Sequence, residues 1–330
     1  MGKRKGRMIK NVISAAAIPI ILYLILLIMR PEAMGGTQIL DILRQAMLPT
    51  ILAWGVTFAC KLGLWHFAAG ANVIAGIILG GGIANRLGGG NLLIAVCIIV
   101  TSLIIGCLSG LLYIKMKVPS IIATVGTMLI LESISALAWG GGGVSVDPSF
   151  GQFFNRTPVV IISTVIFFFI AYVLYTKTKY GFNLKAVANN INVAQQQGIN
   201  VDKVKLISFI LVGLYSGFYG VLSLARSNVQ NPTTNMGSMD MVFSAIMCFF
   251  VAAALEKYVN LIVGVYIGGV TVQLIKFGIV AMGLSGQFNN AAVAVALLVF
   301  CALSSESPYM VQFRQRFRRL RRSNVQVKKQ

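Results

Sequence analysis

Long apolar runs, separated by short polar stretches, fill most of this chain. A helix rises about 1.5 Å per residue and needs about 20 residues to cross roughly 30 Å of hydrocarbon. Helices are required there because lipid offers no partners for open backbone groups. The pattern therefore predicts an all-α polytopic membrane protein with about ten transmembrane helices. We place them at 12–29, 46–60, 66–84, 92–114, 119–139, 158–175, 204–225, 241–255, 259–282 and 289–304.

Three regions follow from this pattern: a basic N-terminus at 1–11, a transmembrane domain at 12–304 and a basic tail at 305–330. Composition agrees, since 57% of the residues are hydrophobic, 11% are charged and the mean hydropathy is +0.82. Such a chain has too little polar surface to be soluble at this length. We expect a multi-pass protein of the cell membrane.

The basic residues sort to one side of the predicted topology. If the N-terminus is cytoplasmic, the tail is too, and so are the basic loops around Lys61, Lys115, Lys117, Lys177–Lys205 and Lys257. The positive-inside rule supports this orientation, with both termini cytoplasmic. The net charge of +20 then sets orientation and meets anionic membrane lipid. We expect no nucleic-acid partner, because no aromatic platform or RNA-binding motif accompanies the basic tail.

The sequence lacks the motifs of nucleotide hydrolysis and metal catalysis. It has no GxxxxGK[ST] phosphate loop, no HExxH motif, no CxxC pair and a single histidine. These chemistries need such residues at such spacings. We expect no catalytic residues, no metal site and no cofactor in this chain.

A polar, helix-like island lies between hydrophobic segments at 183–201. Its apolar positions recur at spacings of three and four residues: Leu184, Val187, Ala188, Ile191 and Ala194. This spacing predicts a short amphipathic helix, which Gly198 would end. The apolar stripe could lie on the membrane domain or in the cleft of a soluble partner.

Two blocks resemble the permease subunits of ribose-type ABC sugar importers over roughly residues 40–305. One block is Val118-Pro-Ser-Ile-Ile-Ala-Thr-Val-Gly-Thr127. The other comprises Thr178-Lys-Tyr-Gly181, Ala186-Val-Ala-Asn-Asn190, Ala194-Gln-Gln-Gln-Gly198-Ile-Asn-Val201 and Gly213-Leu-Tyr-Ser-Gly217-Phe-Tyr-Gly220. The resemblance implies a permease subunit that moves a sugar-like solute inward by alternating access. The resemblance also implies that the chain is not itself an enzyme, because a separate cytoplasmic ATPase subunit would bind and hydrolyse ATP.

In that family the island is the coupling helix, so the resemblance implies that the loop at 177–205 contacts the ATPase through residues 183–198. The implied contact residues are Leu184, Val187, Ala188, Asn189, Asn190, Ile191, Ala194 and Gly198. The outer loops Trp139–Phe154 and Arg226–Asp240 would meet an extracytoplasmic solute-binding protein. A second permease chain would complete the conduit.

Two family motifs are degenerate here. At 62–70 the chain has Leu-Gly-Leu-Trp-His66-Phe-Ala-Ala-Gly70 in place of Gly-Gly-x-Asp-Leu-Ser-x-Gly, and at 252–260 it places Glu256 in a former glycine motif. Each motif follows a span of only about 15 residues. We interpret His66 as a packed, snorkelling interface residue more than as a solute ligand. The loss of both motifs is compatible with a heterodimer with a more typical permease and equally with a homodimer.

Ionisable groups within spans are costly and are usually paired or face a polar cavity. Glu132 and Lys276 fall in predicted spans, either as a mutual pair or as separate cavity-lining groups. With Thr124 and Thr127, they are the predicted solute-pathway residues.

Other functions remain open at this point. One is import of a nucleoside or a furanose-like signal by the same type of transporter. Another is ion-coupled secondary transport, which titration of Glu132 or Lys276 with transport would favour. A third is a non-transporting membrane scaffold.

Overall fold

The computed structural model describes residues 2–33, 35–285, 288, 291–296 and 298. Within these residues, seven helices are long and apolar enough to cross a membrane, and two shorter apolar helices lie at Ala16–Met29 and Met239–Leu255. This confirms an all-α polytopic membrane protein. The predicted last span, 289–304, lies largely outside the described residues, and the tail at 305–330 lies wholly outside them.

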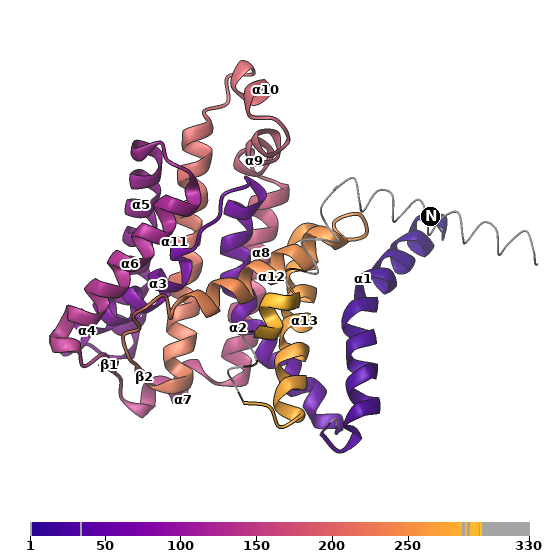
Figure 1. The fold of residues 1–330 in the computed structure, drawn as a ribbon, viewed down its shortest axis with the longest axis horizontal. Coiled ribbons are helices and arrows are strands. Elements are labelled where there is room, and N and C mark those ends of the chain that lie inside the picture. The colour runs from indigo at the N-terminus through magenta and orange to yellow at the C-terminus, as the bar shows by residue number, and fades with distance from the viewer. Residues whose placement is uncertain (1, 34, 286–287, 289–290, 297, 299–330) are drawn as a thin grey trace, which may run out of the picture.

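The elements form a helical bundle with one very short antiparallel β-ladder (Figure 1). In chain order they are α1 Gly2–Met29, η1 Pro31–Ala33, α2 Gly36–Lys61, α3 Ala68–Ala75, η2 Gly76–Gly80, α4 Gly81–Arg86, α5 Asn91–Met116, α6 Ser120–Leu137, η3 Ala138–Gly141, β1 Val144–Ser145, α7 Pro148–Phe154, α8 Thr157–Thr176, α9 Lys179–Asn189, α10 Ile191–Gln196, α11 Val201–Ser227, β2 Val229–Gln230, α12 Met239–Leu255 and α13 Leu261–Ala281.

The second helix is longer than its apolar run. The sequence predicts a short span at 46–60, but α2 begins at Gly36, so that prediction is wrong. The physical reason is that Asp41, Arg44 and Gln45 interrupt the apolar run but still lie within the helix. Their polar side chains line a pocket. The other short span is confirmed, since α12 has 17 residues.

The third span is continuous but irregular. It begins as α3, passes through the π-helical turn η2 and continues as α4. Trp139 stabilises the irregular turn, because its indole Nε1 donates to the Ile78 carbonyl at 2.7 Å. π-Helical turns occur where a helix is adapted to a local packing need. Here Gly80 leaves room for α5, since a Cβ on it would lie 2.6 Å from the Cys97 carbonyl oxygen.

The core of the bundle is built around α11. This helix packs against α5 through facing glycines: a Cβ on Gly106 would lie 2.7 Å from the Cα of Gly213. Small residues let membrane helices approach closely and gain van der Waals contact. On another side of α11, the buried Tyr215 hydroxyl donates to the Phe167 carbonyl of α8 at 3.1 Å.

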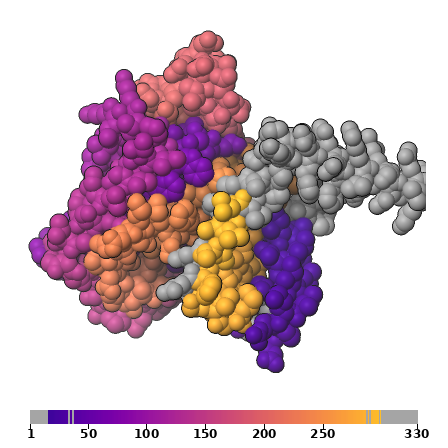
Figure 2. Space-filling model, viewed as in Figure 1, coloured from indigo at the N-terminus to yellow at the C-terminus, as the bar shows by residue number. Residues whose placement is uncertain are grey.

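The two ends of the bundle differ. At one end α9 and α10 project, and Figure 2 shows them as a protrusion at the top of the molecule. The opposite end carries α7 and the β1–β2 ladder (Figure 1). Lys61, Lys185 and Lys205 make their contacts at the α9–α10 end of the bundle, where α2, α5 and α8 have their C-terminal ends. The basic loops thus gather at one end, while its cytoplasmic orientation stays a prediction.

Candidate functional site

The projecting segment consists of two helices, so the prediction of a single helix through 183–198 is wrong. The chain leaves helical geometry at Asn190, where φ is −159° and ψ is 113°. Its side-chain Oδ1 accepts hydrogen bonds from the backbone nitrogens of Asn192 at 3.0 Å and Val193 at 3.1 Å. Asparagine is a preferred N-cap because it satisfies such free amides. The Asn189-Asn190 pair was the sequence signal for this break.

The break divides the predicted apolar stripe. Leu184 and Val187 on α9 and Ala194 on α10 are buried against the bundle, at 0%, 2% and 1% exposure. Ala188 is half-buried. Ile191 leaves the stripe and is 44% exposed, because a new helix starts beside it.

The polar rim of the pair faces outward. Asn189 and Asn190 are exposed. Gly198 ends α10 as predicted: it has φ of +77°, its backbone nitrogen donates to the Gln195 carbonyl, and the next backbone nitrogen, of Ile199, donates to the Ala194 carbonyl. These two bonds form a Schellman motif, which favours glycine at the left-handed position.

Lys61, which directly precedes the degenerate motif at 62–70, contacts Glu256 of the other degenerate motif. Lys61 Nζ lies 2.8 Å from both carboxylate oxygens of Glu256. The Tyr175 hydroxyl donates to Glu256 Oε1 at 3.3 Å, and Lys185 Nζ lies 4.2 Å from the centroid of the Tyr175 ring. We call these four residues the joint cluster. It connects the ends of α2, α8 and α12 to α9.

Burial and the neighbouring charges of the joint cluster also alter the pKa of Lys185. Partial burial lowers the pKa of this amine, while the nearby Glu256 carboxylate acts to raise it and Lys61 to lower it. Lys185 therefore lies between one opposite and one like charge on neighbouring helices. Movement of α9 relative to α2 and α12 would change both interactions.

His66 is buried in the loop between α2 and α3, outside the candidate spans. Its ring is 0% exposed and its centroid lies 4.5 Å from that of Phe209. Neither ring nitrogen has a hydrogen-bond partner among the described residues. The histidine is packed, as predicted, but it does not snorkel to an interface. Desolvation lowers its pKa to about 4, so the ring is neutral at physiological pH.

Glu132 fixes the start of α12. Its Oε2 accepts from the Met236 backbone nitrogen at 2.9 Å, and its Oε1 accepts from the Ser238 backbone nitrogen at 3.0 Å and hydroxyl at 2.6 Å. Gly70 lies against the same turn, because a Cβ on it would overlap the Ser238 carbonyl oxygen. The degenerate motif at 62–70 thus keeps its last glycine where α3 crosses the start of α12.

The other predicted pathway residues also have partners within the subunit. Thr124 Oγ1 lies 2.9 Å from the Trp65 carbonyl oxygen and accepts from the Phe67 backbone nitrogen at 3.2 Å. Thr127 donates to the carbonyl of Ala123, one turn earlier, at 2.8 Å. The contacts of Thr124 connect the 62–67 loop to α6. A role of the two threonines in a solute pathway stays a prediction.

Lys276 lies on α13 and donates to the Ser244 hydroxyl of α12 at 2.8 Å. Both carboxylate oxygens of Glu132 are engaged at the start of α12 instead. The structure therefore does not bring Glu132 and Lys276 together, and they remain separate candidates.

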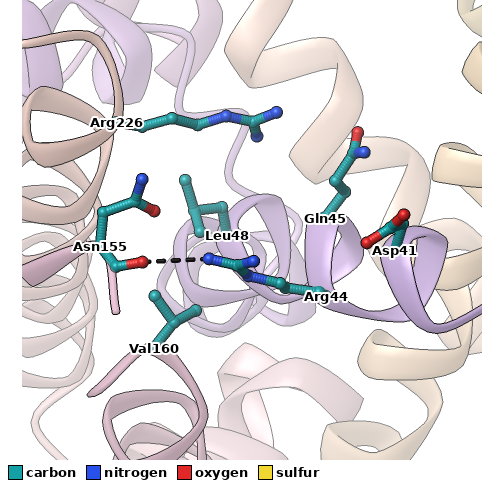
Figure 3. Close-up of a pocket in the computed structure, with 7 residues that line it drawn as sticks. All are labelled: Asp41, Arg44, Gln45, Leu48, Asn155, Val160 and Arg226. Atoms are coloured by element: carbon teal, nitrogen blue, oxygen red, sulfur yellow. Dashed lines mark hydrogen bonds between the residues drawn. The ribbon is translucent and has the colours of Figure 1, made fainter. Parts of the chain in front are cut away.

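A polar pocket lies at the end of the bundle opposite α9 and α10, and sequence reasoning missed it. It has a volume of about 210 Å³. Figure 3 shows its lining: Asp41, Arg44, Gln45, Leu48, Asn155, Val160 and Arg226. An Arg44 Nη donates to the Asn155 carbonyl at 3.0 Å. Polar residues at 41, 44 and 45, on one face of α2, were the available signal.

Comparison with known proteins agrees with these features. A family model described as branched-chain amino acid transport system / permease component matches residues 38–303. The ribose import permease protein RbsC of Bacillus subtilis (strain 168) is 27% identical over 295 residues, which cover 84% of this chain and 88% of the relative. The galactose/methyl galactoside import permease protein MglC of Escherichia coli (strain K12) is 22% identical over 309 residues, 87% of this chain and 91% of the relative. The chain belongs to this permease family, as a divergent ribose-type ABC importer permease of the cell membrane.

Proposed function

We propose that this chain is the membrane subunit of an ABC importer that carries a sugar-like solute inward by alternating access, powered by ATP hydrolysis in a separate cytoplasmic chain. The projecting α9–α10 pair is the observation that carries the proposal. Its inner face is buried on the bundle through Leu184 and Val187, while its outer face is exposed in the described part of the chain. The names of the relatives, which are ribose and galactose import permeases, support a sugar-like solute.

The outer face of the pair has the properties of a docking surface. Phe182, Ile191 and Val193 are 59%, 44% and 47% exposed at the projecting end. Large exposed apolar side chains surrounded by polar residues are typical of protein–protein contacts. Asn189, Asn190 and the glutamines of α10 supply the polar surroundings. We assign this surface to the ATPase subunit.

The joint cluster is the proposed route of transmission. An ATPase that displaces α9 moves Lys185 relative to Tyr175 and Glu256, and through Glu256 it acts on α2 and α12. The buried contacts of Leu184 and Val187 carry the same displacement into the bundle. Rigid elements with packed contacts transmit such movements as a unit.

Two further partners complete the proposal. A solute-binding protein would dock at the opposite end, near α7 and the β1–β2 ladder. A second permease chain, identical in a homodimer or different in a heterodimer, would form the other half of the conduit.

The first experiment is a pull-down of the tagged chain from mildly solubilised native membranes, with every co-purifying chain identified. We expect an ATPase subunit in the complex. Val193→Asp should release it, because the substitution puts a charge into the docking surface. Tyr258→Asp is the matched control, since both side chains are 47% exposed but Tyr258 lies in the α12–α13 loop.

The outcomes separate the alternatives. Absence of an ATPase in several mild detergents would refute the importer and leave ion-coupled transport or a scaffold. An ATPase that stays bound to Val193→Asp but leaves Tyr258→Asp would refute the assigned surface. A nucleoside or furanose-like signal as solute would leave both results unchanged and would appear in uptake assays with those compounds.

A further inference from the structure

Two guanidinium groups from different helices line the polar pocket (Figure 3). Arg44 comes from α2 and is half-buried, and Arg226 comes from the last turn of α11 and lies at the rim. Within the described part of the chain, neither has an ion-pair partner, and Arg226 has no hydrogen bond. Arginine stays protonated in proteins and presents five N–H donors. Both groups therefore have donors free for an anionic oxygen.

The inner part of the pocket contains amide groups that can form hydrogen bonds with hydroxyls. The Gln45 side chain is half-buried, and its Oε1 accepts from Gln273 of α13 at 2.9 Å, which fixes the orientation of the amide. The carbonyl of Asn155 already accepts from Arg44, and Figure 3 shows the Asn155 side-chain amide directed toward Arg226. Amides offer both donors and acceptors, as a hydroxyl-rich molecule requires.

The size of the pocket restricts its occupant. Pockets for drug-sized ligands are about 300–1,000 Å³, and this one has about 210 Å³. It can hold a molecule of about monosaccharide size, or one side chain of a docking protein. The half-buried Gln45, which a bare carboxylate would leave unused, favours the sugar-like molecule.

The charged residues of the lining indicate where an anionic group of a bound molecule would lie. Asp41 is exposed at the rim and lies at the side of Gln45, whereas Arg226 and Asn155 lie across the pocket from it (Figure 3). Two arginines against one aspartate leave the lining with a positive balance. A carboxylate would bind between Arg44 and Arg226, away from Asp41, and the hydroxyls of the same molecule would face Gln45.

We propose that this pocket binds the carboxylate of an acidic sugar-like solute, so that the protein prefers sugar acids to neutral sugars. The inference rests on the proposed importer function and names its substrate class. The preference arises because Arg226 and Arg44 are left without an anionic partner when a neutral sugar binds.

The test compares galacturonate with galactose, which differ at a single carbon that is carboxylate in one and alcohol in the other. The full-length chain is placed in lipid nanodiscs, and dissociation constants are measured by saturation-transfer NMR, which reaches weak affinities. We expect galacturonate to bind about tenfold or more tightly than galactose, as hydrogen bonds to a charged group imply. Arg226→Gln should remove that difference, because it weakens the binding of galacturonate more than that of galactose.

Arg156→Gln is the matched control. This arginine is exposed near the same end of the bundle, but it donates to the carbonyl of Gln152 and does not line the pocket. The control should keep the preference for galacturonate. Arg226 is the better test position than Arg44, because Arg44 also holds the Asn155 backbone.

Three results would overturn the inference. One is equal binding of the two sugars by the unmodified chain. Another is a preference that Arg226→Gln leaves intact. The third is tighter or equal binding of a glutamate-containing peptide, which would assign the pocket to a carboxylate of a docking protein. ATPase co-purification and the Val193→Asp result do not depend on this pocket, so either proposal can fail alone.

Discussion

Replacing Glu132 by glutamine should destabilise the protein, because the change removes a buried charge that three donors share. The carboxylate is 2% exposed and accepts bonds of 2.9, 3.0 and 2.6 Å from Met236 and Ser238. Hydrogen bonds to charged groups contribute about 1.5–3 kcal/mol each, neutral ones about 0.5–1.5 kcal/mol, and a buried unsatisfied donor costs about 1–3 kcal/mol. Glutamine keeps one acceptor but turns an NH₂ group toward a backbone N–H. We expect a loss of about 2–4 kcal/mol of unfolding free energy.

Thermal unfolding of the purified protein, followed by intrinsic fluorescence in one detergent, measures this loss. At about 2–4 °C per kcal/mol for a large domain, Glu132→Gln should lower Tm by about 4–16 °C. Ser133→Ala is the neighbouring control and should shift Tm little, since Ser133 is exposed and donates only to a carbonyl of its own helix. Ser238→Ala should cost less in the Glu132→Gln background than in the unmodified protein. An unchanged Tm for Glu132→Gln, or equal costs of Ser238→Ala in both backgrounds, would refute the assignment of Glu132 to this turn.

Three further predictions concern the degenerate motifs. Gly70→Ala should lower Tm, at a cost of about 1–3 kcal/mol for overpacking, because its Cβ would overlap the carbonyl oxygen of Ser238, just before α12, whereas Gly126→Ala, with nothing within 4 Å, should not. Burial lowers the pKa of His66 from 6.5 to about 4, so the unfolded chain binds a proton at higher pH than the folded chain. About 2 kcal/mol of stability should therefore be lost between pH 7 and pH 5. Tm measured against pH should fall less steeply in acid for His66→Gln than for the unmodified protein, and equal slopes would contradict the burial argument. The Lys61–Glu256 pair is partly exposed, at 23% and 39%, so loss of the pair in Lys61→Glu should cost only about 0.2–1 kcal/mol, to which repulsion between the two carboxylates adds. Adding Glu256→Lys should restore both Tm and the solute-stimulated ATPase activity of the proposed importer complex, and a double variant as impaired as the single one would argue against the ion pair.

The sequence by itself determined the helices and much of their extent. The predicted spans 92–114 and 158–175 became Asn91–Met116 and Thr157–Thr176. The bilayer explains this success, because hydrocarbon thickness fixes the length of an apolar helix. Gly198 was also predictable, since its left-handed conformation follows from local backbone sterics. Apolar run length and backbone conformation are both properties of neighbouring residues along the chain.

Only the tertiary structure decided which residues that are distant in sequence come into contact. Lys61 and Glu256 lie 195 residues apart in sequence, and nothing in the sequence around either residue predicts that they pair. The same holds for Arg44 and Arg226, which share a pocket although Arg44 interrupts an apolar run and Arg226 ends another helix. In lipid, helices are not sorted by hydrophobicity, because the tails are as apolar as the side chains. Their pairing depends on close contacts such as Gly106 against Gly213, whose geometry exists only after the helices have packed.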